Sequence, residues 1–226
     1  MIEVEGLRKS YDGVAAVRGV SFHVPAGEVL GLVGPNGAAK TTTLRCVAGI
    51  DIAAAPVEAK RQLAFVPDEP QLFEYLTVDE HLRFVARLYG VHDAAERVGP
   101  LLEELELSGK RRALPGELSR GMRQKLAIAC GLLHDPKVLL LDEPLTGLDP
   151  VGIRRMKGTI TARARAGAAV VLSSHLLHLV EELCTRLLVV SRGRVVASGT
   201  VEQIIAERPE LTGLSLEEMF VELTSQ

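Results

Sequence analysis

The sequence predicts an α/β protein whose core is a mainly parallel β-sheet. Strand-like and helix-like segments alternate over most of the 226 residues, as they do in parallel sheets. A glycine-rich turn at residues 34–39 also lies between a buried strand and a helix that begins near Lys40. The composition, 47% hydrophobic and 24% charged, is ordinary for a folded protein of this length.

The N-terminal third is expected to contain β-structure followed by this turn and its helix. Val20, Phe22 and Val24 alternate with polar residues, which is typical of a half-buried strand. Residues 28–33 form a more continuous apolar run that predicts a fully buried strand. Leu63–Val66 predicts a further short strand.

The middle of the chain, residues 71–135, is expected to be helical. Thr77 and Glu80 fit a capping box, in which each side chain bonds the backbone of the other residue. Periodic apolar residues predict a helix after this box, a second near residues 98–105, and a third that Ser119 caps.

Strands and helices alternate again after residue 136, which continues the parallel pattern. The expected elements are strands at Val138–Leu141, Ala169–Leu172 and Arg186–Val190, helices near 152–164 and from Leu176, a hairpin turn at 191–194, and capping boxes at 200–203 and 215–218.

Charge and hydropathy exclude several classes of protein. The net charge of −3 argues against a nucleic-acid grip driven by bulk electrostatics. The apolar runs are far shorter than the roughly 20 residues that span a bilayer, and the N-terminus lacks signal-peptide features. Cys46, Cys130 and Cys184 have no metal-like spacing and indicate buried thiols in a reducing compartment. A membrane role would therefore require a partner protein.

Residues 34–42, Gly-Pro-Asn-Gly-Ala-Ala-Lys-Thr-Thr, fit a phosphate-binding loop (P-loop). Successive backbone N–H groups in such a turn, at the positive end of a helix, can surround a β-phosphate. Lys40 would bridge the β- and γ-phosphates, and the Thr41 hydroxyl would bind Mg²⁺. A turn that merely joins a strand to a helix has no need of Lys-Thr-Thr at the start of the helix.

Ala39 departs from this pattern, because P-loops normally have glycine directly before the lysine. If the position requires a positive φ, the Cβ of Ala39 costs on the order of 1 kcal/mol. Crowding against a phosphate would add to this cost. The sequence therefore leaves open whether nucleotide binding is weakened.

Two further segments carry the most specific pattern in the chain. Residues 118–124 read Leu-Ser-Arg-Gly-Met-Arg-Gln, and a later apolar run at 139–141 ends in Asp142 and Glu143. A P-loop, this signature and a strand ending in Asp-Glu, in this order, resemble the ATP-binding-cassette (ABC) ATPases.

The resemblance extends over most of the chain, because residues 146–150 resemble the family's D-loop and residues 173–175 its switch-histidine segment. It implies one ABC ATPase domain with a P-loop NTPase core, an antiparallel β N-terminal part and a helical signature lobe. The expected parts of the domain, residues 1–226, are the ATP-binding core at 1–70 and 136–200, the helical lobe at 71–135 and C-terminal helices at 201–226.

The resemblance implies catalytic roles for Lys40, Glu143 and His175. Glu143 would polarise the attacking water, and His175 would hydrogen-bond the γ-phosphate. Taken alone, a histidine at a strand end is more often structural, because imidazole also caps helices and fills polar gaps.

The resemblance also implies ATP and Mg²⁺ as ligands. Thr41, Asp68 and Asp142 would bind the metal, with Asp142 acting through water. Asp68 stands where the family usually has a glutamine, and its shorter, charged side chain changes the coupling geometry. The residues implied to bind ATP are Tyr11, which would stack on adenine, Gly34, Pro35, Asn36, Gly37, Ala38, Ala39, Lys40, Thr41, Thr42, Asp68, Ser119, Gly121 and Asp149.

Ser119 and Gly121 imply a second subunit, because in this family the signature of one cassette closes on the ATP of another. A serine at a helix N-terminus offers N–H groups and the helix dipole to an anion, and it also serves as a plain cap. Asp149 would contact the opposing subunit. The expected partners are thus a second ABC ATPase subunit, in a homodimer, and a membrane permease, with no nucleic acid. This arrangement would place the protein on the cytoplasmic face of a cell membrane.

The resemblance implies an ATPase that drives transport through the permease by closing as a dimer on ATP, and residues 67–70, Pro-Asp-Glu-Pro, resemble those of export-type bacterial cassettes. Two alternatives to an export-type transport ATPase remain open. A soluble ABC ATPase usually has tandem cassettes or a coiled-coil insertion, and neither is present here. A degenerate regulatory cassette is compatible with Ala39, although Glu143 and His175 are retained. The cluster of Phe73, Tyr75 and Leu76 is expected either to line a groove for a membrane partner or to pack in the core.

Two smaller expectations concern histidines and a short segment. His81, His92 and His178 belong to no motif and are expected on the surface. The stretch between Lys40 and Asp68 is shorter than the family pattern, so either a peripheral strand is lost or the sequence omits residues there. Omission is favoured, because loss of a strand would leave its neighbour with an exposed edge.

Overall fold

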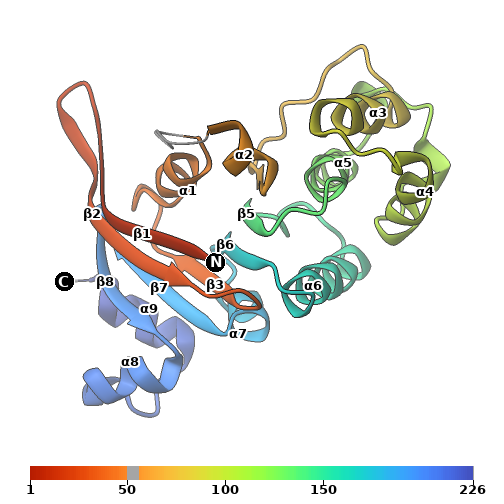
Figure 1. The fold of residues 1–226 in the computed structure, drawn as a ribbon. Coiled ribbons are helices and arrows are strands. Elements are labelled where there is room, and N and C mark those ends of the chain that lie inside the picture. Colours follow the sequence, from red (N-terminus) through yellow and green to blue (C-terminus); the bar gives the residue numbers. More distant parts are fainter. Residues whose placement is uncertain (50–55, 226) are drawn as a thin grey trace.

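The structure, a computed structural model, describes residues 1–49 and 56–225. It contains a central sheet, a smaller sheet and helices on both faces of the central sheet (Figure 1). The strands are β1 (Ile2–Tyr11), β2 (Val14–Val24), β3 (Val29–Val33), β4 (Leu63–Val66), β5 (Val138–Asp142), β6 (Ala169–Ser173), β7 (Arg186–Ser191) and β8 (Arg194–Gly199). The helices are α1 (Lys40–Gly49), α2 (Pro56–Arg61), α3 (Val78–Tyr89), α4 (Ala94–Glu104), α5 (Arg120–Leu132), α6 (Pro150–Arg165), α7 (Leu177–Leu183), α8 (Val201–Glu207) and α9 (Leu216–Thr224), with 3₁₀ turns at Ser108–Lys110, Pro115–Glu117 and Pro209–Leu211.

The central sheet has the strand order β4-β5-β6-β3-β7-β8. All neighbouring pairs in it are parallel except the β7–β8 hairpin, which is antiparallel. The carboxyl ends of β3, β4, β5 and β6 therefore meet at one edge, where open α/β sheets bind ligands. The expected α/β class with a mainly parallel core is confirmed.

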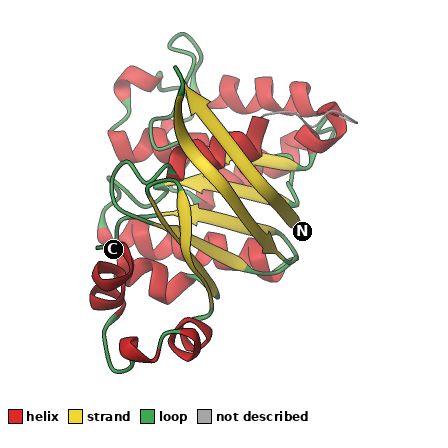
Figure 2. Ribbon diagram, turned by 90° about the vertical axis from the view of Figure 1, so that its left-hand side faces the viewer, coloured by secondary structure: helices red, strands yellow, loops and turns green. Residues whose placement is uncertain are grey.

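β1 and β2 form a separate antiparallel sheet in the described part of the chain. Figure 2 shows these two long strands crossing in front of the central sheet. The antiparallel N-terminal part implied by the family resemblance is thus confirmed. The expectation of a missing strand concerns the chain around residues 50–55, which lie outside the described residues.

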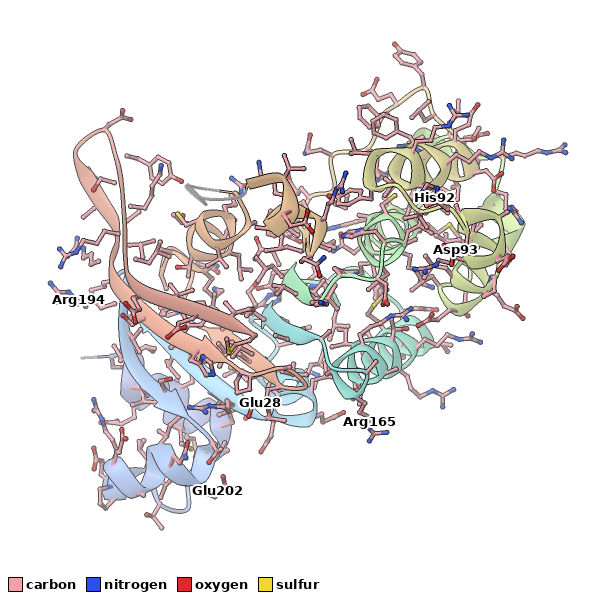
Figure 3. The ribbon with its side chains drawn as sticks, viewed as in Figure 1. Glu28, His92, Asp93, Arg165, Arg194 and Glu202 are labelled. Atoms are coloured by element: carbon pink, nitrogen blue, oxygen red, sulfur yellow. The ribbon has the colours of Figure 1, made fainter. Side chains whose placement is uncertain are left out.

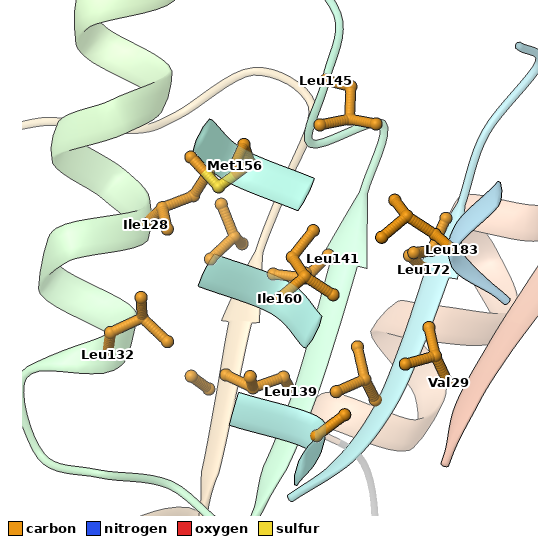
Figure 4. Close-up of a cluster of buried hydrophobic side chains, with 14 of the residues drawn as sticks. Val29, Ile128, Leu132, Leu139, Leu141, Leu145, Met156, Ile160, Leu172 and Leu183 are labelled. Atoms are coloured by element: carbon orange, nitrogen blue, oxygen red, sulfur yellow. The ribbon is translucent and has the colours of Figure 1, made fainter. Parts of the chain in front are cut away.

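The central sheet separates two apolar clusters. Because strand side chains alternate between faces, Leu139 and Leu141 of β5 point to one cluster and Leu140 to the other. In the first cluster they pack against Ile128 of α5 and Ile160 of α6 (Figure 4). In the second cluster the same sheet packs against α1 and the β1–β2 sheet. Burial on both faces explains why the strands read as continuous apolar runs.

The helical lobe begins with the expected capping box. The Glu80 backbone N–H donates to the Thr77 hydroxyl at 3.3 Å, and the Thr77 N–H donates to the Glu80 carboxylate at 2.8 Å. The expectation that His81 lies on the surface is wrong, since it is only 3% exposed. Its Nε2 accepts from the Phe73 N–H at 3.0 Å, and its Nδ1 lies 2.8 Å from the Thr77 carbonyl oxygen. His81 therefore ties the preceding loop to α3.

The outer surface carries charges of both signs. Figure 3 shows Asp93, Arg165, Arg194 and Glu202 on widely separated parts of the molecule, and all four are exposed. His92 and His178 are exposed as expected. Among the helices of residues 1–49 and 56–225, none has both the length and the apolar character needed to cross a membrane.

Gly13 and Gly193 are a matched pair for testing how the two sheets are joined. Each is the second residue of a two-residue hairpin turn, with φ of 81° for Gly13 and 76° for Gly193. A Cβ on Gly193 would lie 2.1 Å from the Ala16 carbonyl oxygen, whereas Gly13 has open space around it. The Gly193 carbonyl also accepts from the Arg18 N–H at 2.8 Å.

We expect Gly193→Ala to lower the free energy of unfolding by about 3 kcal/mol, from strain plus the overlap with Ala16. Gly13→Ala should cost about 1 kcal/mol, from strain alone. Urea denaturation of the two variants measures the difference. Equal losses would show that the β7–β8 turn does not pack tightly on β2.

Candidate functional site

A cavity of about 560 Å³ lies at the carboxyl edge of the central sheet. The P-loop after β3 forms one side, and the ends of β4, β5 and β6 form the other. Its lining residues are Tyr11, Ala16, Asn36, Gly37, Ala38, Ala39, Lys40, Thr41, Thr42, Asp68, Asp142, Glu143, Thr146 and His175. The fold thus brings together residues that are distant in sequence but were expected to share one site.

The P-loop is held against β7 at its first glycine. A Cβ on Gly34 would lie 2.3 Å from the Val190 carbonyl oxygen, so only glycine fits there. The Lys40 ammonium donates to the Gly34 carbonyl at 2.7 Å and to the Pro35 carbonyl at 3.4 Å. Burial lowers the pKa of Lys40, while the Glu143 and Asp142 carboxylates oppose this shift. The backbone carbonyls of Gly34 and Pro35 therefore hold the Lys40 ammonium in position.

Ala39 adopts the left-handed conformation, with φ of 76°. A positive φ was the condition under which the sequence predicted strain at Ala39, and the structure meets it. The Cβ of an L-residue lies too close to the backbone in this conformation. Gly37 has a similar φ of 80°, which glycine adopts freely. The Ala39 carbonyl is fixed by two bonds from Thr43, from its N–H at 2.9 Å and its hydroxyl at 2.8 Å. The start of α1 therefore holds Ala39 in its strained form.

Asp142 ends β5 and is only 2% exposed. The Ser173 hydroxyl donates to its Oδ1 at 2.5 Å, and the two residues are directly paired across β5 and β6. Such a buried carboxylate is stabilised by a fixed donor and can hold one orientation towards a cation.

Glu143 leaves the strand with φ of 50°. Its N–H is shared between the carbonyl and hydroxyl oxygens of Ser173, each at 3.1 Å. Its Oε2 lies 2.8 Å from the His175 Nδ1 and accepts from the His175 N–H at 3.3 Å. The Thr146 hydroxyl is 3.5 Å from the same oxygen. Since a carboxylate only accepts, Nδ1 of His175 carries a proton, and Nε2 has no hydrogen-bond partner among the described residues.

The cavity offers oxygen ligands that suit Mg²⁺, namely the Thr41 hydroxyl and the carboxylates of Asp68 and Asp142. Within the described residues there is no group of three or more His, Cys, Asp or Glu close enough to hold a metal alone. A magnesium ion here would need phosphate oxygens of a nucleotide as further ligands, which is its usual mode of binding.

Tyr11 also lines the cavity and is 50% exposed. The Lys9 ammonium lies 5.3 Å from the centre of the Tyr11 ring. An exposed aromatic ring at the rim of a phosphate site is suited to stacking on a base.

Two of the expected ATP-binding residues at the start of the P-loop, Gly34 and Pro35, do not line this cavity in the described structure. Neither do Ser119, Gly121 and Asp149, which were expected to meet ATP across a dimer. Ser119 is exposed and caps α5, accepting from the Met122 N–H at 3.2 Å. Asp149 caps α6 by accepting from the Gly152 N–H at 2.8 Å. Their expected roles towards ATP stay predictions that require a second subunit.

Ser173 and Thr146 had no specific role among the sequence-based expectations, although both lay inside segments that resembled family motifs. Ser173 bonds both Asp142 and Glu143, and Thr146 approaches the Glu143 carboxylate. The sequence did contain a signal for the role of Ser173. It is a small hydroxyl residue at the end of a predicted strand, and another predicted strand ends in Asp-Glu.

A second cavity, of about 350 Å³, lies between the loop after β4, α3 and α5. Its walls are mainly apolar, and Phe73, Phe84 and Leu88 are 44% to 64% exposed along it. Phe73 and Phe84 meet edge to face with ring centres 5.2 Å apart. Of the three residues of the expected aromatic cluster, Phe73 lines this groove, whereas Tyr75 and Leu76 are not among its lining residues. Tyr75 is 88% exposed beside it.

This fold and this first cavity define a P-loop ATP-binding domain, and comparisons with known proteins assign it to a family. Residues 17–146 match the family model described as ABC transporter. The chain belongs to this family as an ATP-binding protein, which confirms the expected ABC assignment.

Known relatives cover nearly the whole chain. The chain is 39% identical over 219 residues to a "Nod factor export ATP-binding protein I" of Burkholderia pseudomallei (strain 1710b), covering 90% of this chain and 72% of that protein. It is 30% identical over 241 residues to the "ABC-type transporter ATP-binding protein EcsA" of Bacillus subtilis (strain 168), covering 100% of this chain and 97% of that protein. The solved "Structure of ATP binding subunit of ABC transporter" is 36% identical, with a TM-score of 0.92 and 98% of each chain covered.

We expect Ala39→Gly to tighten Mg-ATP binding by up to about tenfold, equivalent to about 1.4 kcal/mol. The Cβ of Ala39, at a positive φ of 76°, lines the cavity, so glycine would relieve strain that grows on binding and contact of this Cβ with phosphate. Titration with a fluorescent ATP analogue measures the change. Ala38→Gly is the control, because Ala38 lacks a positive φ and is 3% exposed, and it should not tighten binding. Equal affinities of Ala39→Gly and the parent protein would mean that the loop tolerates Ala39.

Proposed function

We propose that this protein binds Mg-ATP in the first cavity and hydrolyses it to drive an export-type transporter. The observation that carries the proposal is the convergence of Lys40, Thr41, Asp142, Glu143 and His175 on one cavity. Lys40 and the N-terminus of α1 hold the phosphates, since N–H groups and the helix dipole both favour anions there. Thr41 and Asp142, together with Asp68, hold the magnesium ion, which neutralises phosphate charge.

Glu143 acts as the base that takes a proton from the attacking water. Its Oε2 is oriented by His175 and Thr146, so the carboxylate is preorganised for this role. A proton on Nε2 as well would let His175 donate to the γ-phosphate, since a phosphate oxygen only accepts. This geometry favours an active ATPase over a degenerate cassette, because both residues are present and in contact.

We further propose that two copies of the chain form the complete catalytic unit. Ser119 and the N-terminus of α5 are exposed and lie outside the cavity of their own chain. A helix N-terminus that faces solvent can bind a phosphate presented by a second copy. A site formed by the cavity of one copy and the start of α5 of the other requires a homodimer that closes on ATP.

The second cavity is proposed as the contact surface for a separate membrane permease. It is a mainly apolar groove rimmed by Phe73, Phe84 and Leu88, and such a groove suits an amphipathic helix of a partner. Relatives named for Nod factor export support export as the direction of transport. Binding to a permease would hold the protein at the cytoplasmic face of the membrane.

Replacing Glu143 by Gln should retain ATP binding but slow hydrolysis at least about a hundredfold, because the variant loses the general base and keeps its shape. With saturating Mg-ATP the variant should also double its mass in light scattering. Phosphate release and nucleotide titration measure the two activities. Glu69→Gln, at an exposed carboxylate on the loop after β4, is the control and should hydrolyse ATP at the parental rate. Hydrolysis by Glu143→Gln at the parental rate would overturn the assignment of the base.

Replacing Leu88 by Glu should reduce association with membranes that contain the permease more than about tenfold, because a charge in an apolar groove is costly to desolvate. Val221→Glu on α9 is the matched control, since Val221 is 60% exposed and Leu88 is 64% exposed. Sedimentation of both variants with membranes of the source cell gives the comparison. ATP binding should be unchanged in both. Equal membrane association would rule out the groove as the docking surface.

A further inference from the structure

Arg120 contacts two loops that border the nucleotide cavity. It is the first residue of α5, directly after Ser119. Its Nη2 donates to Asp68 Oδ1 at 3.2 Å, in the loop after β4. Its aliphatic stem packs on Gly147, in the loop after β5, where an added Cβ would lie 3.3 Å from Arg120 Cδ. One side chain thus joins the start of α5 to both loops.

Asp68 has two possible electrostatic partners. It lines the nucleotide cavity together with Thr41 and Asp142, and it also pairs with Arg120 outside the cavity. A divalent cation at Thr41 and Asp142 would attract the Asp68 carboxylate away from the single positive charge of Arg120. The two interactions compete because they draw on the same small side chain.

α5 and the loop after β4 have a second contact, and this contact is weak. The Gln124 amide lies 3.5 Å from the Pro67 carbonyl oxygen, at the limit of a hydrogen bond. Gln124 is 2% exposed, and its Oε1 has no partner within the described part of the chain. A buried acceptor without a protein donor is unfavourable, so this contact adds little to the attachment of α5 to the loop.

We infer that Arg120 is a positioning residue that withholds Asp68 from the magnesium site until Mg-ATP binds. The inference rests on the proposed function of the cavity. If Asp68 turned towards a cation held by Thr41 and Asp142, Arg120 would lose its ion pair, and the turn that carries Ser119 would be released from the loop after β4. Binding of Mg-ATP in the cavity would in this way change how firmly the turn with Ser119, which the second copy would contact, is held.

The strength of the ion pair is suited to such an exchange. The side chains of Arg120 and Asp68 are 58% and 41% exposed, so solvent screens their attraction. Pairs of this kind change an equilibrium constant by no more than about fivefold. The pair can therefore bias the loop without preventing the binding of Mg²⁺.

A double-mutant cycle tests this inference. Arg120→Met retains the stem that packs on Gly147 but removes the charge, and Asp68→Asn removes the carboxylate. Binding of a fluorescent ATP analogue to the full chain is measured over a range of free Mg²⁺. We expect Arg120→Met to lower the half-saturating Mg²⁺ concentration about threefold when Asp68 is present. It should have no effect in the Asp68→Asn protein, and Arg120→Lys should stay close to the parent.

The outcomes separate this inference from its alternatives. Removing a positive charge would by itself attract cations in both backgrounds, so an equal shift in the parent and in the Asp68→Asn protein would overturn the role of the ion pair. Absence of any shift in the Arg120→Met protein would overturn it as well. If the parent protein binds no nucleotide in the presence of Mg²⁺, the proposed function of the cavity fails instead. Arg120→Gln repeats the test if Arg120→Met does not fold.

Discussion

The parallel pairing of β3, β5 and β6 is the constraint on which the site depends. In this register Ser173 lies opposite both Leu32 of β3 and Asp142 of β5. A slip of one residue would turn every side chain to the opposite face, and Asp142 would lose the Ser173 hydroxyl. Alternate apolar residues of each strand enter different clusters, so the register is held by the close packing of each side chain in its own cluster. The geometry of the cavity is thus a consequence of core packing several residues away.

Two of the six described non-glycine residues with positive φ lie at the same edge of the sheet. Ala39 and Glu143 both have positive φ, and both line the cavity. Such conformations persist when surrounding bonds over-determine them, as Thr43 does for Ala39 and Ser173 does for Glu143. At Glu143 the turn directs the carboxylate towards His175, which an ideal continuation of β5 would not do. The strain is therefore part of how the site is formed.

Local signals in the sequence predicted most elements because their causes are local. The capping boxes that begin at Thr77, Thr200 and Ser215 all form, since each needs only residues three positions apart. The P-loop follows its strand because its sequence sets its own turn and helix start. His81 was misplaced because its burial depends on the loop at Phe73, which packs over it through tertiary contacts. The Asp68–Arg120 pair joins residues 52 positions apart, and nothing in either segment alone indicates that they meet.

The exposed end of α5 contacts the loop after β5 through backbone atoms, because the residues that meet there, Gly121 and Gly147, are both glycine. A Cβ on Gly121 would lie 2.7 Å from the Gly147 carbonyl oxygen, so the first turn of α5 rests directly on the loop after β5. This loop begins at Glu143, whose carboxylate lies in the cavity. Close-packed backbone transmits small displacements more faithfully than long side chains, which absorb them by changing rotamer. Gly147 and Gly121 therefore connect the loop that begins at Glu143 to the turn that carries Ser119, while Arg120 connects the same turn to Asp68. The exposed end of α5 therefore contacts the loops after β4 and β5, which both contribute residues to the cavity.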